Sequence, residues 1–106
     1  MPRILAREAL LLYRRSEAFF IGCGASTHPI AGGLYFRDCL KIVNPKLLKA
    51  ITKNRMLIVY CAWNDEGHSA SVAHFWMKQG IKNIRVVFGG DAEMKKVGFK
   101  FLKFKK

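Results

Sequence analysis

The chain has 106 residues, 51% of them hydrophobic, which predicts one compact domain over 1–106 and excludes a disordered chain. Nineteen Lys and Arg against seven Asp and Glu give a net charge of +12. Because the basic residues are spread along the chain without an arginine-rich run or a nucleic-acid motif, we expect a solvated basic surface and not a nucleic-acid site.

The same sequence argues against export and membrane insertion. No run approaches the roughly 18–20 apolar residues of a membrane-spanning helix. Arg3, Arg7 and Glu8 stand where a secretory signal would have its apolar stretch. We therefore expect a cytoplasmic protein without membrane contact, and we also expect a monomer that needs no cofactor.

In the first half of the chain, the elements can be read from apolar spacing. Residues 5–15 place Leu5, Ala9, Leu12 and Tyr13 on one face of an amphipathic helix. The apolar run 18–21 predicts a buried strand that ends at Gly22 and Gly24. Residues 23–39 are rich in Gly, Ser, Thr and Pro, so we expect irregular structure there with one short strand near 34–36. Pro45 predicts the start of a helix that continues to about Ile51.

The second half begins with the clearest strand, 56–60, which has five apolar residues without polar alternation and should be buried on both faces. After a polar loop we expect a helix over about 69–79, with Trp76 and Met77 in the core and Gly80 as its stop. Residues 84–87 predict another strand, and 92–97 a short helix between glycines. This alternation predicts an α/β fold with a small open parallel sheet and helices on both faces.

The three cysteines are Cys23, Cys39 and Cys61. No pair has the close spacing of a zinc site, and an odd number without an export signal does not predict a disulfide framework. We therefore expect reduced thiols and no metal. Cys23 follows the first predicted strand, where a relay or resolving role competes with that of a buried loop cysteine.

Cys61 is the first residue after the most buried strand, and ligands of open parallel sheets bind beyond the carboxyl ends of the strands. The loop after it leads into a helix N-terminus, whose free amides favour a thiolate and anionic sulfur species. The alternative interpretation is that Cys61 is a small buried hydrophobic residue without a chemical role. If its sulfur were sealed in the core with those amides turned elsewhere, the enzymatic interpretation would fail.

Four segments together resemble the second half of a rhodanese domain. They are 58–61 (Ile-Val-Tyr-Cys), 69–73 (Ser-Ala-Ser-Val-Ala), 80–84 (Gly-Ile-Lys-Asn-Ile) and 88–90 (Phe-Gly-Gly). The stretch 27–33 resembles the Gly-His-Ile-Pro-Gly-Ala stretch in the first half of such domains. The resemblance implies a sulfurtransferase that carries sulfane sulfur from thiosulfate or a small or protein persulfide to a thiol acceptor. It implies a persulfide on Cys61, cradled by Ala62, Trp63, Asn64, Asp65, Glu66, Gly67 and His68.

The sequence departs from that family's pattern in three ways. The loop after Cys61 is about two residues longer than is common. It contains Asp65 and Glu66 but no Arg or Lys, which disfavours a dianion such as thiosulfate. The family's Asp-x-Arg after the second strand is replaced by Gly22-Cys23-Gly24. His68 could compensate for the acidic residues if protonated.

Two other functions compete with sulfur transfer. A cysteine-dependent phosphatase needs an arginine six positions after its cysteine, and Gly67 stands there. A catalytically weak or inactive module that binds a protein partner fits the acidic loop but does not explain Cys61. Among the remaining candidates, His28 is interpreted as structural and His74 as a surface residue, while Trp63 fits either the rim of the site or simple packing.

Overall fold

The computed structural model describes residues 2–24, 27–36, 46, 50, 55–62 and 66–102, and for 66–68 it describes the backbone only. The described strands form one sheet in the order β1-β5-β4-β2-β3, and every pairing between them is parallel. Their bounds are Arg3–Ile4 (β1), Ala18–Cys23 (β2), Leu34–Phe36 (β3), Met56–Tyr60 (β4) and Ile84–Val87 (β5).

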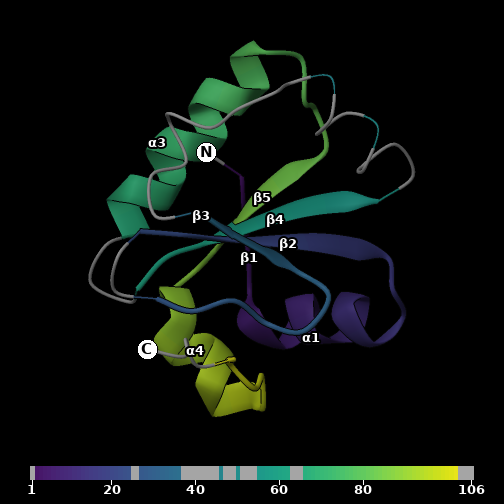
Figure 1. Cartoon of the computed structure of the whole chain (residues 1–106), viewed down its shortest axis with the longest axis vertical. Helices are drawn as coiled ribbons and strands as arrows, with labels where there is room; N and C mark the ends of the chain where they lie inside the picture. The colour runs from purple at the N-terminus through teal and green to yellow at the C-terminus, as the bar shows by residue number, and fades with distance from the viewer. Residues whose placement is uncertain are drawn as a thin grey trace.

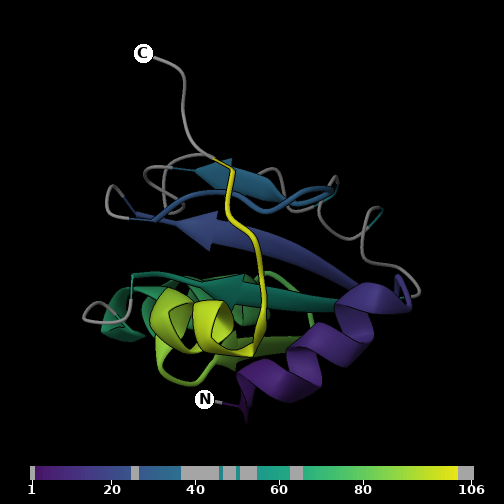
Figure 2. The same ribbon diagram turned by 90° about the horizontal axis from the view of Figure 1, so that it is seen from below.

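Helices cover both faces of this sheet. Figure 1 shows α3 (Glu66–Lys78) on one side, with α1 (Ala6–Arg14) and α4 (Gly90–Val97) together on the other. Figure 2 shows the same layers from below, with the chain after α4 running back across the α1 and α4 side. The predicted α/β fold with an open parallel sheet between helices is confirmed.

The two central strands are apolar on both faces because each face has its own helical layer. Ile21 and Val59 point into the core beneath α3, whereas Phe20 and Ile58 point into the core beneath α1 and α4. All four side chains are at most 2% exposed. Each contributes roughly 1.5–3 kcal/mol through removal from water, which accounts for the absence of polar alternation in β4.

Helix α1 matches the predicted element to within a residue at each end. Ala9 is fully buried, and Leu12 and Tyr13 pack against the same core. The Tyr13 hydroxyl donates a hydrogen bond to the Ala31 carbonyl at 2.8 Å. Leu5, expected on the buried face, is instead 41% exposed because it precedes the helix at the edge of the sheet.

Helix α3 begins at Glu66, three residues before the predicted start, and buries Ser69, Val72, Ala73 and Trp76. Met77 was expected in the core, but it is 37% exposed. At 100° per residue, position 77 lies at the margin of the buried stripe, so its side chain reaches solvent. The expectation for Met77 was therefore wrong.

The carboxyl-terminal segment closes the α1 and α4 side. Helix α4 is terminated by Gly98, which has a φ of 113°. Phe101 then forms an isolated antiparallel bridge with Ile30. The Leu102 amide donates to the Pro29 carbonyl at 2.8 Å. The segment 99–102 thereby holds residues 28–30 against the carboxyl end of β4.

Other boundaries differ modestly from expectation. β2 continues through Gly22 to Cys23, and α4 begins at Gly90 instead of Ala92. The short edge strand β1 was not predicted, because two residues carry no periodic signal. The helix predicted for 45–51 lies outside the described residues except for Lys46 and Ala50, which are helical.

Candidate functional site

Cys61 follows β4 directly, at the carboxyl edge of the sheet, as the sequence predicts. Its carbonyl accepts a hydrogen bond of 2.9 Å from the amide of Asp91, in the first turn of α4. The end of the central strand is thus tied to the start of a helix on the opposite face from α3. The backbone of Cys61 is therefore held by β4, which it follows, and by α4.

The Cys61 side chain is fully buried, with 0% of its surface exposed. Its thiol is outside any disulfide and lies in the core beneath α3, together with Val59, Val72 and Cys23. An accessible thiol was expected here, and the described residues show a sealed one. Burial is therefore the observation that counts most strongly against a ready nucleophile.

The loop predicted to cradle Cys61 is described only in part. Ala62 is buried, 7% exposed, whereas Trp63, Asn64 and Asp65 lie outside the described residues. Glu66, Gly67 and His68 were expected in the loop, but their backbone forms the first turn of α3, a place where an acidic residue is favoured by the helix dipole. The cradle itself stays a prediction.

A buried polar pair that the sequence analysis missed lies beside Cys61. The Thr27 hydroxyl donates a hydrogen bond of 2.9 Å to the carboxylate of Asp91, and the two residues are 0% and 6% exposed. In the sequence, the pair was indicated only by Asp91, an acidic residue that directly follows Gly89-Gly90 near the start of a predicted helix. The contact joins residues 64 positions apart, so no local pattern could reveal it.

Tyr60 precedes Cys61 and points to the other face of the sheet. Its hydroxyl donates a hydrogen bond of 2.7 Å to the His28 carbonyl. Burial raises the pKa of this hydroxyl far above its ordinary value, and the negative charge of Asp91 raises the pKa further. Tyr60 is therefore a neutral hydrogen-bond donor that fixes the segment around His28, which supports the structural interpretation of that histidine.

Cys23 ends β2 and is 1% exposed. Its sulfur takes part in a disulfide that does not include Cys61. The expectation that the thiols are reduced is therefore wrong for this residue. Cys39 lies outside the described residues. His74 is exposed on α3, as expected of a surface residue.

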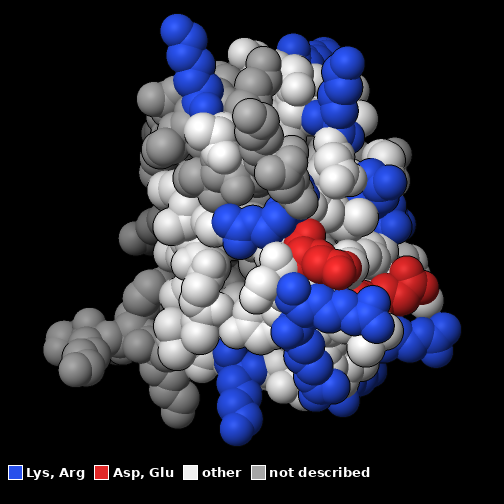
Figure 3. Space-filling view, turned by 90° about the vertical axis from the view of Figure 1, so that its right-hand side faces the viewer, with Lys and Arg blue, Asp and Glu red and all other residues white. Residues whose placement is uncertain are grey.

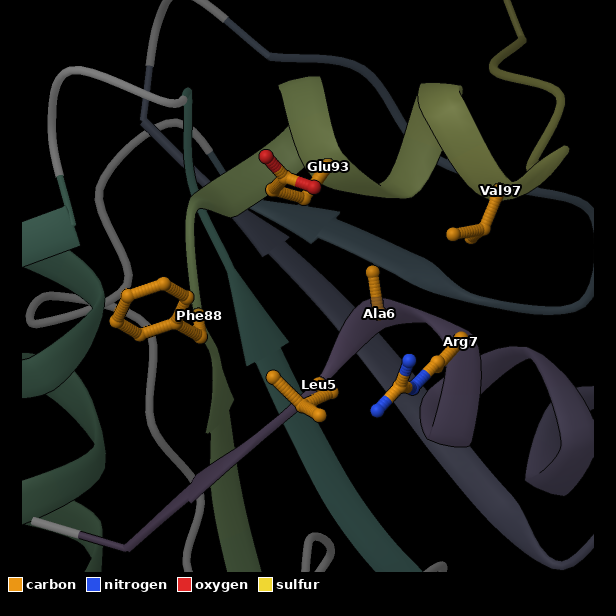
Figure 4. Close-up of a pocket in the computed structure, with 6 residues that line it drawn as sticks. All are labelled: Leu5, Ala6, Arg7, Phe88, Glu93 and Val97. Carbon is orange, nitrogen blue, oxygen red and sulfur yellow. The ribbon is translucent and has the colours of Figure 1, made fainter.

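No group of three or more His, Cys, Asp or Glu side chains within the described ranges could hold a metal ion. Nor is any described helix long and apolar enough to cross a bilayer. A hollow of about 400 Å³ lies at the edge of the sheet between α1 and α4 (Figure 4). It is lined by Leu5, Ala6, Arg7, Phe88, Glu93 and Val97, and none of the predicted site residues belongs to it.

Comparison with known proteins identifies the fold. No protein-family model and no curated protein matches the sequence. A rhodanese-like domain from Anabaena superposes with a TM-score of 0.75 at 15% identity, over 98% of this chain and 80% of that one. A rhodanese-related protein from Thermoplasma volcanium gives a TM-score of 0.66 at 20% identity, over 96% and 98%.

A third similar structure comes from Rhodopseudomonas palustris and is described as a protein of unknown function and a possible tyrosine phosphatase. Its TM-score is 0.69 at 14% identity, over 96% of this chain and 85% of that one. These likenesses show that the chain is an α/β module with a rhodanese-like fold. They do not identify a reaction, so the chemistry of the chain must be argued from the residues at the carboxyl ends of the strands.

Proposed function

We propose that the chain is a rhodanese-type sulfurtransferase in which Cys61 accepts a sulfane sulfur as a persulfide and passes it to a thiol. The observation that carries the proposal is the place of Cys61, the first residue after the central strand of a rhodanese-like fold. In open parallel sheets this edge is where ligands bind. Nucleophilic chemistry at this edge requires that the Cys61 sulfur, which is buried in this structure, become accessible to the donor.

The charges near Cys61 favour one class of donor. Asp65 and Glu66 follow it in the sequence, and the buried carboxylate of Asp91 sits on the helix whose amide binds the Cys61 carbonyl. Negative charge disfavours the approach of a dianion such as thiosulfate. A small-molecule or protein persulfide, which carries less charge, is the donor that this surrounding suits best.

The second candidate is a module that binds a protein partner without catalysis. The complete burial of the Cys61 side chain favours it, because sulfur transfer requires a donor to reach that atom. This burial also means that the sulfurtransferase should react slowly with bulky reagents. Phosphatase activity has no comparable support, since Gly67 occupies the position where phosphate would need an arginine.

Mass spectrometry after incubation with a persulfide donor tests the proposal. Trypsin places Cys61 on the peptide 56–78, separate from Cys23 on 16–37 and Cys39 on 38–41. We expect the mass of one sulfur atom to be added to peptide 56–78 in the wild type and in Cys39→Ser, and not in Cys61→Ser. No gain on 56–78 in the folded wild type would reject the Cys61 persulfide.

Kinetic assays test the donor. We expect Cys61→Ser to lose sulfur transfer from a low-molecular-weight persulfide, with circular dichroism confirming that the variant is folded. Equal turnover by that variant would reject the role of Cys61. Brisk transfer from thiosulfate to cyanide at neutral pH would reject the preference for persulfides while leaving the role of Cys61 intact.

A further inference from the structure

Cys23, the last residue of β2, and Cys61, the first residue after β4, lie one step beyond the last paired residues of these two adjacent parallel strands. β2 and β4 pair in register from Ala18 with Met56 through Gly22 with Tyr60. The next residues along the two strands are Cys23 and Cys61. Laterally paired residues of adjacent strands lie roughly 4.7–4.9 Å apart, which falls within the roughly 4.4–6.8 Å between Cα atoms that a disulfide spans.

Both side chains also point to the same face of the sheet. Successive side chains of a strand alternate between faces, and Ile21, Cys23, Val59 and Cys61 all belong to the core beneath α3. With 1% and 0% of their surfaces exposed, the two cysteines are shielded together from solvent. The strand pairing therefore brings two sulfur-bearing side chains side by side inside the core.

The two sulfurs differ in oxidation state. Cys23 takes part in a disulfide, whereas Cys61 carries a thiol. A disulfide next to a thiol is the arrangement from which thiol–disulfide exchange proceeds, because the attacking thiolate has its target sulfur within reach.

We propose that Cys23 and Cys61 form an exchange pair. The Cys61 thiolate attacks the Cys23 sulfur, an S–S bond forms between them, and the bond from Cys23 to its former partner breaks. That partner leaves as a thiolate and takes up the proton that Cys61 released. One disulfide is exchanged for another, so the step balances without an external oxidant or reductant.

The pair adds redox control to the site. While Cys61 is joined to Cys23 by a disulfide, its sulfur is not a thiolate and cannot accept a sulfane sulfur. The reverse exchange restores the Cys61 thiolate. This inference needs only the thiol chemistry of Cys61 and does not depend on sulfur transfer. The two proposals can therefore fail separately.

The variant Cys39→Ser leaves only the two cysteines in question. The protein is reduced, freed of reductant, oxidised under native conditions with diamide, a thiol-specific oxidant, and digested with trypsin without reduction. We expect the peptides 16–37 and 56–78 to appear joined by a disulfide. In the untreated wild type at pH 8, where more thiolate is present, we expect the same linked pair to accumulate with time.

A matched control moves the thiol to the other face of the sheet. In Cys39→Ser/Cys61→Ala/Ile58→Cys, the cysteine stays buried in β4 but lies in the core beneath α1 and α4, on the opposite face from Cys23. We expect linkage to be at least about tenfold slower in this variant, because the favourable placement is lost. Equal rates in the two variants, or no linkage in folded Cys39→Ser, would overturn the proposal.

Persulfide formation distinguishes this inference from the proposed function. A linked 16–37 and 56–78 pair together with no sulfur gain on 56–78 would retain the exchange pair and reject sulfur transfer. Sulfur gain without linkage would retain sulfur transfer and reject the exchange pair.

Discussion

The side chains around Cys61 are held by hydrogen bonds from residues distant in the sequence. Thr27 donates to Asp91, the Asp91 amide donates to the Cys61 carbonyl, and the Tyr60 hydroxyl donates to the His28 carbonyl. The family's Asp-x-Arg is absent from the end of β2, and Asp91 supplies a buried carboxylate from α4 instead. These hydrogen bonds connect the carboxyl end of β4 to α4 and to the segment 27–28.

Thr27→Val should lower the free energy of unfolding by about 1–3 kcal/mol, because it removes a hydroxyl donor from a buried carboxylate while keeping the side-chain shape. Urea denaturation measures the change. Thr27→Ser keeps the hydroxyl and serves as the control, with a smaller loss that reflects one methyl group. A Val variant as stable as the wild type would show that the hydrogen bond contributes nothing.

Tyr60 should make the fold sensitive to alkali. Its folded pKa is raised by burial and by Asp91, so the neutral form is favoured in the native state. The stabilisation is complete below the pKa of an unfolded tyrosine, about 10, and is lost as the pH rises from there towards the folded pKa. Urea midpoints between pH 8 and 11 should fall less steeply in Tyr60→Phe, and equal slopes would contradict the assignment.

At the scale of elements, the close approach of β2 and β4 decides which residues fit. A Cβ atom on Gly22 would lie 2.8 Å from Cζ and the hydroxyl oxygen of Tyr60, closer than packed atoms allow. The Tyr60 ring cannot withdraw freely because its hydroxyl is bonded to the His28 carbonyl. A residue without a side chain is therefore required at position 22, because the Tyr60 ring fills the space beside it. Gly22 continues β2, although the sequence predicts that the strand ends there.

Gly22→Ala should destabilise the protein by about 1–3 kcal/mol through overpacking against Tyr60. The same substitution should cost less in a Tyr60→Phe background, where the hydroxyl is gone and the ring is released from His28. A double-mutant cycle of urea unfolding measures the difference. Additive effects would show that the contact with Tyr60 is not the cause.

At the scale of the whole molecule, the dominant electrostatic feature is the net charge of +12. Figure 3 shows Lys and Arg side chains spread over one face, with acidic side chains among them. Several basic groups lie over aromatic rings, as Arg55 does over Phe19 at 5.4 Å and Lys95 over Phe101 at 5.4 Å. These contacts give the basic residues a role in packing and do not define one binding patch.

Binding to duplex DNA should accordingly be weak, independent of sequence and lost as salt rises from about 50 to 200 mM, since it would rest on counterion release alone. Fluorescence anisotropy with two unrelated duplexes measures both properties. A preference for one duplex, or binding that survives at the higher salt concentration, would contradict a merely solvated basic surface.

The sequence was sufficient wherever the signal was local. The uninterrupted apolar run 56–60 predicted a strand buried on both faces, and its end located Cys61 at the carboxyl edge of the sheet. Apolar spacing predicted α1, and the alternation of elements predicted the parallel sheet. Local spacing was less reliable at margins, as Met77 and Leu5 show, because exposure there depends on what packs alongside.

The tertiary structure alone decided how distant residues meet. The strand order puts β2 beside β4, and this order, which no local pattern encodes, makes Cys23 the neighbour of Cys61. It also joins Thr27 to Asp91 and seals the Cys61 side chain beneath α3. Periodicity along a chain records which face of an element is buried, whereas the partner on that face is fixed only when the elements pack.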